Sequence, residues 1–280
     1  MPNQNTSSLL SFCAQYVQKN DPDRFFCTLF IPPPHRELVF RLTAFYIEIT
    51  RAVALPASWS VAGPMAGFIR LQWWRELIEG KDRTHEIAPF IRESIAQKTL
   101  NPSVLLSMIE AREIELDGIK DWEHWDHMMM LSSGALQQTI ASILGIQDKA
   151  QLYAVGALGV AYDIVRMARY LPQMLQIGRC PFPTETIENL HLIRTDDGIV
   201  SNAEIVAQIR MLLIEKVHIY LDAGKKVKAL GRKKNAAILP ITLAKRDLKR
   251  SILWDHIPAK RGIGDQLAVV WSKFTGRSYI

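Results

Sequence analysis

Arginine and tryptophan side chains that could hold an anion are concentrated in the stretch Ile-Arg-Leu-Gln-Trp-Trp-Arg-Glu at positions 69–76. Helical spacing places Arg70, one of the two tryptophans and Leu77 on one face. A guanidinium beside an indole ring can stack on the ring and bind an anionic group. The same spacing also suits an amphipathic helix that buries its tryptophans and leaves its arginines in water. Spacing alone leaves both interpretations open.

Three acidic residues farther along the chain, Glu110, Glu113 and Asp117, have the spacing of one helix face. Clustered carboxylates can bind metal ions or act in acid–base chemistry. A solvent-exposed acidic face is the simpler interpretation, and the nearby Arg112 would offset part of its charge. We therefore assign no catalytic role to this segment.

A second polar cluster combines carboxylate and imidazole side chains. Asp121, His124 and His127 follow one another at intervals of three, which is compatible with a metal site. The neighbouring Trp122 and Trp125 instead favour the start of an ordinary amphipathic helix. The sequence contains no glycine-rich phosphate loop and no nucleophile elbow. Nothing distinguishes a Cys–His pair as a nucleophile.

The positive charge of the chain is concentrated near its C-terminal end. The net charge is +6; residues 225–261 carry 12 Lys/Arg and two acids, and the rest of the chain has 22 basic and 26 acidic residues. Such a segment is attracted to phosphate-bearing surfaces, although a solvated helix face is the plain alternative. We expect salt-sensitive binding to an anionic membrane surface. The residues expected there are Lys225, Lys226, Lys228, Arg232, Lys233 and Lys234.

Composition limits the class of protein. The chain has 280 residues, of which 48% are hydrophobic and 22% charged, a mixture typical of a soluble globular protein. Its three cysteines lack metal-ligand spacing and favour a reducing compartment. We expect no signal peptide and no transmembrane helix, and hence a cytoplasmic protein, at most peripheral on a bacterial inner membrane. Nucleic acid is not expected as a partner because the basic stretch lacks interleaved aromatic residues.

Helical signals run through nearly the whole chain. Strand signals are absent apart from an Asp-Asp-Gly turn at 196–198. Apolar residues repeat every three or four positions from 35 to 53. The segment from 150 to 175 is apolar on nearly all sides and predicts a buried central helix. The sequence thus predicts a single all-α domain over residues 1–280.

Capping residues mark several of these helices. Asn101-Pro102 has the pattern of an N-cap followed by a first-turn proline, and Ser201 with Glu204 has capping-box spacing. Glycines near helix ends, where a left-handed residue is favoured, are Gly80, Gly118 and Gly145.

Five motifs, taken in order, resemble the squalene/phytoene synthase family. They are Phe-Ile-Pro-Pro-Pro-His-Arg at 30–36, Ala-Phe-Tyr-Ile-Glu-Ile-Thr-Arg at 44–51, Leu-Gln-Trp-Trp-Arg-Glu at 71–76, Ile-Val-Arg at 164–166 and Gly-Arg-Cys-Pro-Phe-Pro at 178–183. The similarity covers about residues 10–275. It implies the all-helical isoprenoid synthase fold around a central cavity shaped for prenyl chains. Active members join two prenyl diphosphates head to head, with Mg²⁺ held by two Asp-rich motifs on facing helices.

The chain departs from this family pattern at both metal-binding motifs. The positions that correspond to the acids are Thr50, Arg51, Ala54, Met167 and Leu171. None of them supplies a carboxylate for Mg²⁺, which prefers oxygen ligands, and Arg51 reverses the charge. Glu48 and Asp163 lie nearby, but two isolated carboxylates are poor support for a site with several metal ions. We expect no cofactor, and Mg²⁺ only if the chain is an active enzyme.

The missing acids and the stretch Phe-Tyr-Ile-Glu-Ile-Thr-Arg resemble the non-catalytic branch of the family, which includes the mitochondrial respiratory complex I assembly factor. Our first hypothesis is a pseudoenzyme with a binding or complex I assembly role and a complex I subunit as its client. The alternative is an active Mg²⁺-dependent prenyltransferase that makes squalene or phytoene with a rearranged metal site.

We expect the cavity to persist and to bind a prenyl or lipid-like chain with an anionic head. Its apolar lining is expected from Phe45, Ile49, Met167 and Leu171. The candidates for contacting a substrate or anion are Arg51, Arg70, Arg75, Arg166, Glu48 and Asp163. Arg51 is the first candidate for the head group, unless it pairs with Glu48 on the same helix face.

Overall fold

The chain folds almost entirely into helices. The computed structural model describes residues 10–54, 64–195, 198–227, 234–251, 254 and 261–276. The helices are α1 (Phe12–Asn20), α2 (Pro22–Thr28), α3 (Pro33–Ala54), α4 (Met65–Ile78), α5 (Ala88–Ala96), α6 (Pro102–Asp117), α7 (Trp122–Met129), α8 (Ala135–Ile143), α9 (Lys149–Arg169), α10 (Leu171–Gln176), α11 (Thr184–Asn189), α12 (Ala203–Gly224), α13 (Pro240–Lys249) and α14 (Ile263–Thr275). The predicted all-α fold is confirmed.

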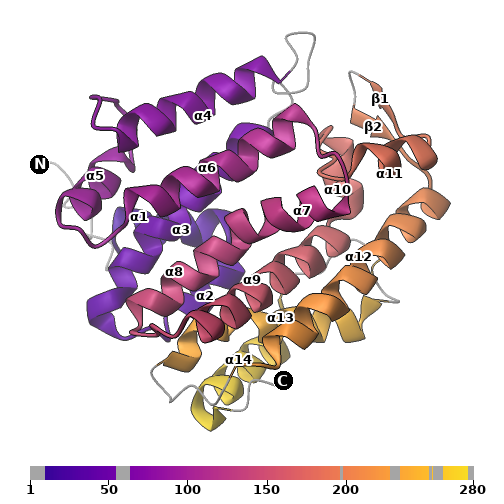
Figure 1. Ribbon diagram of the computed structural model, residues 1–280. Coiled ribbons are helices and arrows are strands. Elements are labelled where there is room, and N and C mark those ends of the chain that lie inside the picture. Colours follow the sequence, from indigo (N-terminus) through magenta and orange to yellow (C-terminus); the bar gives the residue numbers. More distant parts are fainter. Residues whose placement is uncertain are drawn as a thin grey trace, which may run out of the picture.

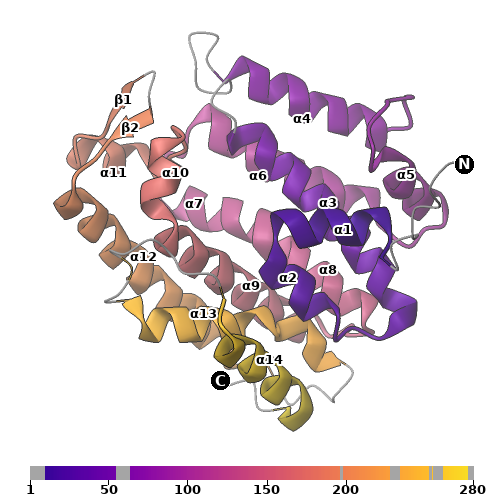
Figure 2. The ribbon, with the colours of Figure 1, turned by 180° about the vertical axis from the view of Figure 1, so that it is seen from behind.

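Most of the long helices lie side by side. Figure 1 shows them stacked from α4 at one edge, through α6, the α7–α8 pair and α9, to α12, α13 and α14 at the opposite edge. In the opposite view α1 and α2 lie in front, with α1 packed on α3 (Figure 2). The buried apolar residues of the described parts form one contiguous cluster.

Helix α9 is the centre of this arrangement, as its apolar composition predicts. It packs against α8, α12 and α13. Small residues allow close approach: a Cβ added to Gly159 would lie 2.5 Å from Gln137 Cβ of α8 and 2.8 Å from the Ser133 carbonyl oxygen. The predicted helix over 150–175 is interrupted, however, because α9 ends at Arg169 and α10 begins at Leu171. Pro172 explains the break, since proline cannot donate the hydrogen bond that would continue α9.

Helix ends follow the capping signals closely. The Asn101 side chain accepts a hydrogen bond from the Ser103 backbone N–H, as predicted. Helix α12 is capped by Asn202, whose side chain accepts from the Ile205 N–H, so the expected cap at Ser201 is one residue too early. The expected glycines Gly80, Gly118 and Gly145 all have positive φ angles.

Two short elements interrupt the helical pattern. Strands β1 (Ile193–Thr195) and β2 (Gly198–Val200) pair antiparallel beside α10 at one edge of the molecule (Figure 1). They flank the expected turn, whose residues 196 and 197 lie outside the described residues. A 3₁₀ turn, Lys234–Ile238, precedes α13.

A π-helical segment, Met130–Gly134, joins α7 to α8. A π turn contains one residue more than an α-helical turn and often lies at a functional position. Here it places Ser132 and Ser133 in the interior, where both side chains are buried. Ser132 contacts Tyr46 of α3 and Arg112 of α6.

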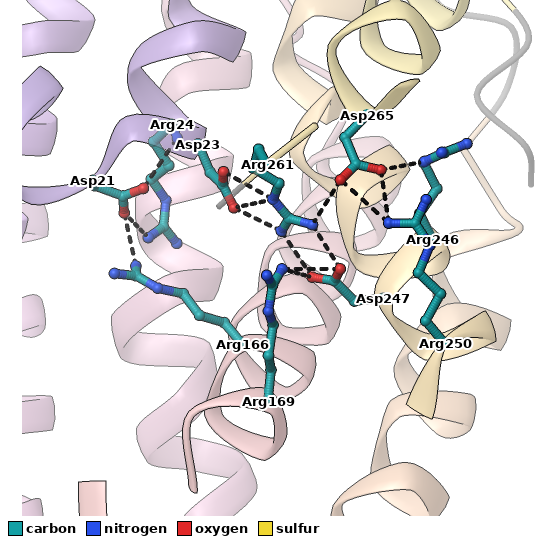
Figure 3. Close-up of polar contacts among 10 residues, drawn as sticks. All are labelled: Asp21, Asp23, Arg24, Arg166, Arg169, Arg246, Asp247, Arg250, Arg261 and Asp265. Atoms are coloured by element: carbon teal, nitrogen blue, oxygen red, sulfur yellow. Dashed lines mark hydrogen bonds and ion pairs between the residues drawn. The ribbon is translucent and has the colours of Figure 1, made fainter. Parts of the chain in front are cut away.

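A cluster of charged side chains, the Arg261 cluster, ties α2, α9, α13 and α14 together (Figure 3). Its members are Asp23, Arg169, Arg246, Asp247, Arg250, Arg261 and Asp265. The Arg261 guanidinium lies 2.7 Å from Asp23 Oδ2 and 2.6 Å from Asp247 Oδ1. Asp247 also accepts from Arg169 at 2.9 Å, and Asp265 accepts from Arg246 at 2.6 Å. Residues far apart in the sequence are therefore fixed to one another by charge.

The Arg261 cluster changes the interpretation of the basic C-terminal stretch. Arg246, Arg250 and Arg261 are paired with carboxylates of the fold, so they do not form the free basic surface that the charge count suggests. Within the described residues, no helix combines the length and apolar character needed to cross a bilayer.

The lysines expected at a membrane are distributed unevenly. Lys225 and Lys226 are exposed, and Lys225 pairs with Asp222 at 2.6 Å. Lys234 donates to the Gly145 carbonyl at 2.8 Å. The other three, Lys228, Arg232 and Lys233, lie outside the described residues.

Removal of the Arg261 side chain should destabilise the protein strongly. Arg261→Ala leaves the largely buried Asp23 and Asp247 without their shared partner, a loss expected to lower the free energy of unfolding by about 3 kcal/mol or more. The matched control is Arg92→Ala, because Arg92 pairs with Asp82, which is 90% exposed. That variant should cost less than about 1 kcal/mol. Urea unfolding measures both, and equal effects would contradict a structural role for the cluster.

Candidate functional site

A cavity of 340 Å³ lies between α3, α6, α7, α9 and α10. One part of its lining is polar and carries three guanidinium groups, from Arg112, Arg166 and Arg179. Another part is apolar and is built largely of methionine side chains, which are Met128, Met129, Met167 and Met174. We call this space the central cavity. Its lining has the character of a site for a molecule with one charged and one apolar end.

Two of the positions at which the family resemblance implies acids line this cavity. Thr50 of α3 and Met167 of α9 both line it. Leu171 does not continue the α9 face, because the helix breaks before it, and its side chain is fully buried. Phe45 and Ile49 are also fully buried in the core and are not part of this lining. Of the four predicted lining residues, the central cavity therefore contains Met167.

One side of the cavity is lined by Tyr46 of α3 and by Asp163 and Arg166 of α9, and Asp21 and Arg24 of the α2 region pair with these residues behind the lining. The Arg24 guanidinium, 3% exposed, lies 2.9 Å from Asp21 Oδ2 and 2.7 Å from Asp163 Oδ1. Arg166 donates to the same Asp21 oxygen at 2.7 Å, and the three residues Asp21, Arg24 and Arg166 appear together in Figure 3. The Tyr46 hydroxyl donates to Asp163 Oδ2 at 2.6 Å. Arg166 is the most accessible member, with a side chain 39% exposed.

A second group of charges comes from α6 and from the loop after α10. Glu115 is buried and accepts from Arg112 Nη1 at 2.5 Å and from Arg179 Nε at 2.6 Å. Arg112 also donates to the Ser132 hydroxyl of the π-helical segment. Ser132 lies 3.3 Å from the Tyr46 hydroxyl, which connects this group to the first one. We call the connected set the cavity network; it contains Asp21, Arg24, Tyr46, Arg112, Glu115, Ser132, Asp163, Arg166 and Arg179.

The cavity network contains four arginines and three carboxylates. Burial alone would raise the pKa of Glu115, but the charges and hydrogen bonds of Arg179 and Arg112 hold it below its ordinary value. The pKa of Asp21 is lowered in the same way, by Arg166 and Arg24 against the effect of burial. Burial and the Asp163 charge raise the pKa of Tyr46, which keeps its hydroxyl protonated as a donor. The network therefore has one positive charge in excess at neutral pH.

These residues do not fit Mg²⁺. Both oxygens of Asp163 are occupied, one by Arg24 and the other by the Tyr46 hydroxyl. Both oxygens of Glu115 accept from arginines. Guanidinium groups at 2.5–2.7 Å repel a divalent cation and hold the lone pairs that it would need. Among the described residues, no group of three or more His, Cys, Asp or Glu side chains is arranged to hold a metal ion.

Other predicted residues meet in a second space, the outer pocket, between α1, α3 and α4. Glu48, Arg51 and Arg70 line it together with Trp73 and Trp74. Arg51 Nη1 lies 3.2 Å from Glu48 Oε1, and the side chain of Arg51 is 52% exposed. Arg51 points away from the central cavity because it is one residue beyond Thr50, a rotation of about 100° around the helix. Of the two alternatives for Arg51, the structure therefore has the pair with Glu48 in the outer pocket, and Arg51 is not part of the lining of the central cavity.

Glu48 is also occupied in this outer pocket. It accepts a hydrogen bond from the Tyr16 hydroxyl and lies 3.4 Å from His85 Nε2. The Trp74 ring contacts both Phe45 and His85. Arg70 and Trp73 share the pocket lining, so the anion clamp expected from their spacing stays a prediction.

The other sequence clusters have structural partners. Arg75 donates to both Glu113 oxygens, at 2.9 and 2.7 Å, and joins α4 to α6. Glu110 and Asp117 are exposed, as a solvated acidic face predicts. Asp121 caps α7 by accepting from the His124 N–H, which supports the amphipathic-helix interpretation.

Several members of the cavity network were not expected from the sequence. Arg112 was expected to offset the acidic face of its helix, and this is wrong because Arg112 and Glu115 lie on the opposite, buried face. The spacing of three residues between Arg112 and Glu115 was the signal in the sequence that could have indicated their pairing. Arg179 lies in the motif at 178–183 and Arg24 lies in none of the motifs; only the fold brings Arg179 to the cavity lining and Arg24 to Asp163 beside it.

Comparison with known proteins identifies the family. The squalene/phytoene synthase family model matches residues 17–252, which is most of the chain. The chain belongs to the squalene/phytoene synthase family. The resemblance of the sequence motifs to this family is thereby confirmed.

Solved structures of the squalene/phytoene synthase type share the fold. A dehydrosqualene synthase in complex with a ligand superposes with a TM-score of 0.70 at 11% identity, covering 96% of both chains. A squalene synthase from Alicyclobacillus acidocaldarius gives a TM-score of 0.57 at 17% identity, covering 94% of this chain and 92% of that one. The isoprenoid synthase helical fold is therefore confirmed.

Curated relatives of this family member include proteins named NADH dehydrogenase (ubiquinone) complex I, assembly factor 6. The human protein is 26% identical over 170 residues, covering 58% of this chain and 49% of its own length. The Drosophila melanogaster homologue is 27% identical over 173 residues, covering 57% of this chain and 50% of its own. The chain thus spans about half the length of the curated relatives it matches.

Stability should depend on pH through Glu115. Because its folded pKa is depressed, Glu115 stabilises the protein fully above its unfolded pKa of about 4.3, and this contribution is lost as the pH falls through the folded pKa. Glu115→Gln should therefore lower the free energy of unfolding by about 3 kcal/mol or more near pH 7, and the difference should shrink below about pH 4. Urea titrations over this range measure it.

The control for that prediction is Glu110→Gln, which changes an exposed glutamate of the same helix. It should leave the free energy of unfolding nearly unchanged at every pH. A Glu115→Gln effect that is the same at both ends of the pH range would show that the carboxylate charge is not what stabilises the site.

Proposed function

We propose that this chain is a catalytically inactive member of the squalene/phytoene synthase family that binds an anionic amphiphile without metal and takes part in the assembly of respiratory complex I. One observation carries the inactive assignment. Three arginines line the cavity in which a synthase would need carboxylates, and the carboxylates present are already paired with arginine. Release of diphosphate requires neutralisation of the developing charge by metal ions, which this donor set does not support.

The lining of the central cavity supports a ligand with an anionic head and one apolar chain. Arg166 is the accessible cation, and its pairing with Asp21 leaves other guanidinium N–H groups for an anion. Methionine side chains adapt to irregular apolar shapes. A volume of 340 Å³ lies at the small end of the range for ligand sites, which suits one chain rather than the two substrates that a head-to-head synthase joins.

The assembly role rests on the curated relatives. They carry the name of a complex I assembly factor and match more than half of this chain. A protein that has kept a ligand-binding fold and has lost its metal site is suited to binding another molecule rather than to turnover. We propose a subunit of complex I as its client. The active prenyltransferase alternative is less well supported, because it would need a metal site assembled from carboxylates that are occupied by arginines.

Binding of a simple anionic amphiphile tests the ligand part of the proposal. Decyl phosphate should bind the purified protein in calorimetry with the same affinity in EDTA as in Mg²⁺, because arginines rather than metal hold the head group. Arg166→Ala should weaken binding about tenfold or more, the scale of one charged hydrogen bond, and Arg166→Lys should weaken it less.

Two controls separate this prediction from general effects. Arg75→Ala removes an arginine that pairs with Glu113 outside the central cavity, and it should leave decyl phosphate affinity unchanged. Farnesyl and geranylgeranyl diphosphate with Mg²⁺ should yield no pyrophosphate above background. Metal-dependent release of pyrophosphate, or binding that requires Mg²⁺, would overturn the inactive assignment.

The assembly role has its own test. In the organism that naturally carries this chain together with complex I, deletion of its gene should lower the amount of assembled complex I on native gels and the NADH oxidation by isolated membranes. A plasmid copy of the wild-type chain should restore both. Unchanged complex I would refute the assembly role and would leave the ligand-binding proposal standing.

A further inference from the structure

The outer pocket is a second space of ligand size, and its walls are largely aromatic. It encloses 410 Å³ between α1, α3 and α4, on the side of the molecule where α4 forms the edge of the stack in Figure 1. Small-molecule sites enclose about 300–1000 Å³. The aromatic side chains in the lining are Tyr16, Trp73, Trp74 and His85. The ligand proposed for the central cavity makes no use of this space.

The aromatic rings form adjoining walls. The centroids of the Trp73 and Trp74 rings are 4.7 Å apart and their planes are inclined by 81°. The His85 ring is inclined by 63° to Trp73 and by 65° to Trp74, so none of the three is stacked face to face on another. Trp74 is buried against Phe45, whereas Trp73 is only half-buried. Part of the Trp73 ring is therefore accessible to a flat molecule in the pocket.

Glu48 holds three of the lining side chains in place. It accepts hydrogen bonds from the Tyr16 hydroxyl and, at 3.2 Å, from Arg51 Nη1. His85 Nδ1 accepts from the Ile87 backbone N–H at 3.3 Å, which places the proton of the neutral ring on Nε2, 3.4 Å from Glu48 Oε2. A pocket whose polar side chains are already fixed loses little conformational entropy when a ligand binds.

The charges of the outer pocket are balanced, and what it offers a ligand is hydrogen-bond donors. Its lining contains two arginines and two glutamates, which are Arg51, Arg70, Glu48 and Glu86. Arg70 has an interaction of its own, and Arg51 uses Nη1 to pair with Glu48 and to donate to the Tyr16 hydroxyl at 2.8 Å. Nε and Nη2 of Arg51 have no partner among the residues that the structure describes. The pocket therefore supplies N–H donors without an excess of positive charge.

We propose that the outer pocket binds an uncharged planar aromatic molecule that carries a carbonyl or a similar hydrogen-bond acceptor. The ring of the ligand packs against Trp73, and its acceptor receives N–H bonds from Arg51. Aromatic rings gain from edge and face contacts with other rings, and a guanidinium donates stronger hydrogen bonds than a neutral group does. An anionic ligand would be repelled by Glu48 and Glu86. The site is separate from the central cavity and does not depend on the proposed function.

Coumarin, a flat uncharged lactone, is the probe that tests the proposal. It should bind the full chain in calorimetry with a stoichiometry of one to one. Octahydrocoumarin keeps the carbonyl but has a saturated ring, and it should bind about threefold or more weakly. Coumarin-3-carboxylate should also bind about threefold or more weakly, because it brings a negative charge beside the two glutamates. Tighter binding of the carboxylate would overturn the assignment to an uncharged ligand and would favour the anion clamp of Arg70 and Trp73.

Variants of the two contacting residues locate the probe. Arg51→Met should weaken coumarin binding about tenfold or more, the scale of one hydrogen bond to a charged group. Trp73→Leu should weaken it about threefold or more, and Trp73→Phe should weaken it less because phenylalanine keeps an aromatic ring.

Matched variants outside the outer pocket serve as controls. Arg92→Met alters an arginine that is 38% exposed and paired with Asp82. Trp122→Leu removes a tryptophan of α7 that also contacts a second tryptophan edge to face, at 5.3 Å between centroids. Arg166→Ala alters the central cavity. All three should bind coumarin within about twofold of the wild type.

Three results would overturn the proposal. They are absence of saturable coumarin binding, equal affinities of the wild type, Arg51→Met and Trp73→Leu, and loss of coumarin binding in Arg166→Ala, which would place the probe in the central cavity. Circular dichroism of each variant separates loss of binding from loss of fold. A failure of decyl phosphate to bind would count against the central cavity alone, because the two ligands occupy different spaces.

Discussion

The structure depends on one constraint: a guanidinium taken into the interior must be paired, with carboxylates for Arg24, Arg112 and Arg169 and with backbone carbonyls for Arg210. An unpaired guanidinium in a protein core is costly enough to unfold a domain. Arg24 meets the constraint through Asp21 and Asp163, Arg112 through Glu115, and Arg169 through Asp247. The Arg24–Asp163 pair joins α2 to α9, the Arg169–Asp247 pair joins α9 to α13, and the Arg179–Glu115 pair joins the loop after α10 to α6, so satisfying these charges also fixes how the elements are placed relative to one another. Electrostatic pairing thereby helps to hold the helices around the central cavity in place.

On the proposed assignment as an inactive family member, the same pairing explains how the synthase fold keeps its architecture without its chemistry. In a metal-dependent site, the carboxylates repel one another until cations arrive. Here Asp163 and Glu115 are neutralised by side chains of the chain itself, so the folded state needs no added ion. The cavity is then left with guanidinium groups and a methionine wall, an arrangement suited to holding a ligand rather than to breaking a carbon–oxygen bond.

Most of the fold and part of the candidate site could be predicted from the sequence. Apolar periodicity and capping residues predicted the helices. The family motifs predicted the fold and showed that Thr50 and Met167 stand where acids are expected. The direction of Arg51 was missed because one residue of helical rotation separates the cavity from the outer pocket. Long-range partners were missed as well: nothing local in the chain indicates that Arg24 meets Asp163, 139 residues later. Which residues pair over such long separations in the sequence is determined by the tertiary fold.

The π-helical segment between α7 and α8 has an evolutionary consequence. Each residue added to a helix turns everything that follows by about 100°. The five residues Met130–Gly134 therefore determine how the buried face of α8, with Leu136 and Ile140, is rotated relative to the buried face of α7, with Trp125. A substitution within the segment changes one contact, whereas a deletion of one residue would turn a whole apolar face toward water. The length of the segment therefore fixes how α8 is rotated relative to α7. We expect relatives with this cavity to vary the residues of the segment while keeping their number.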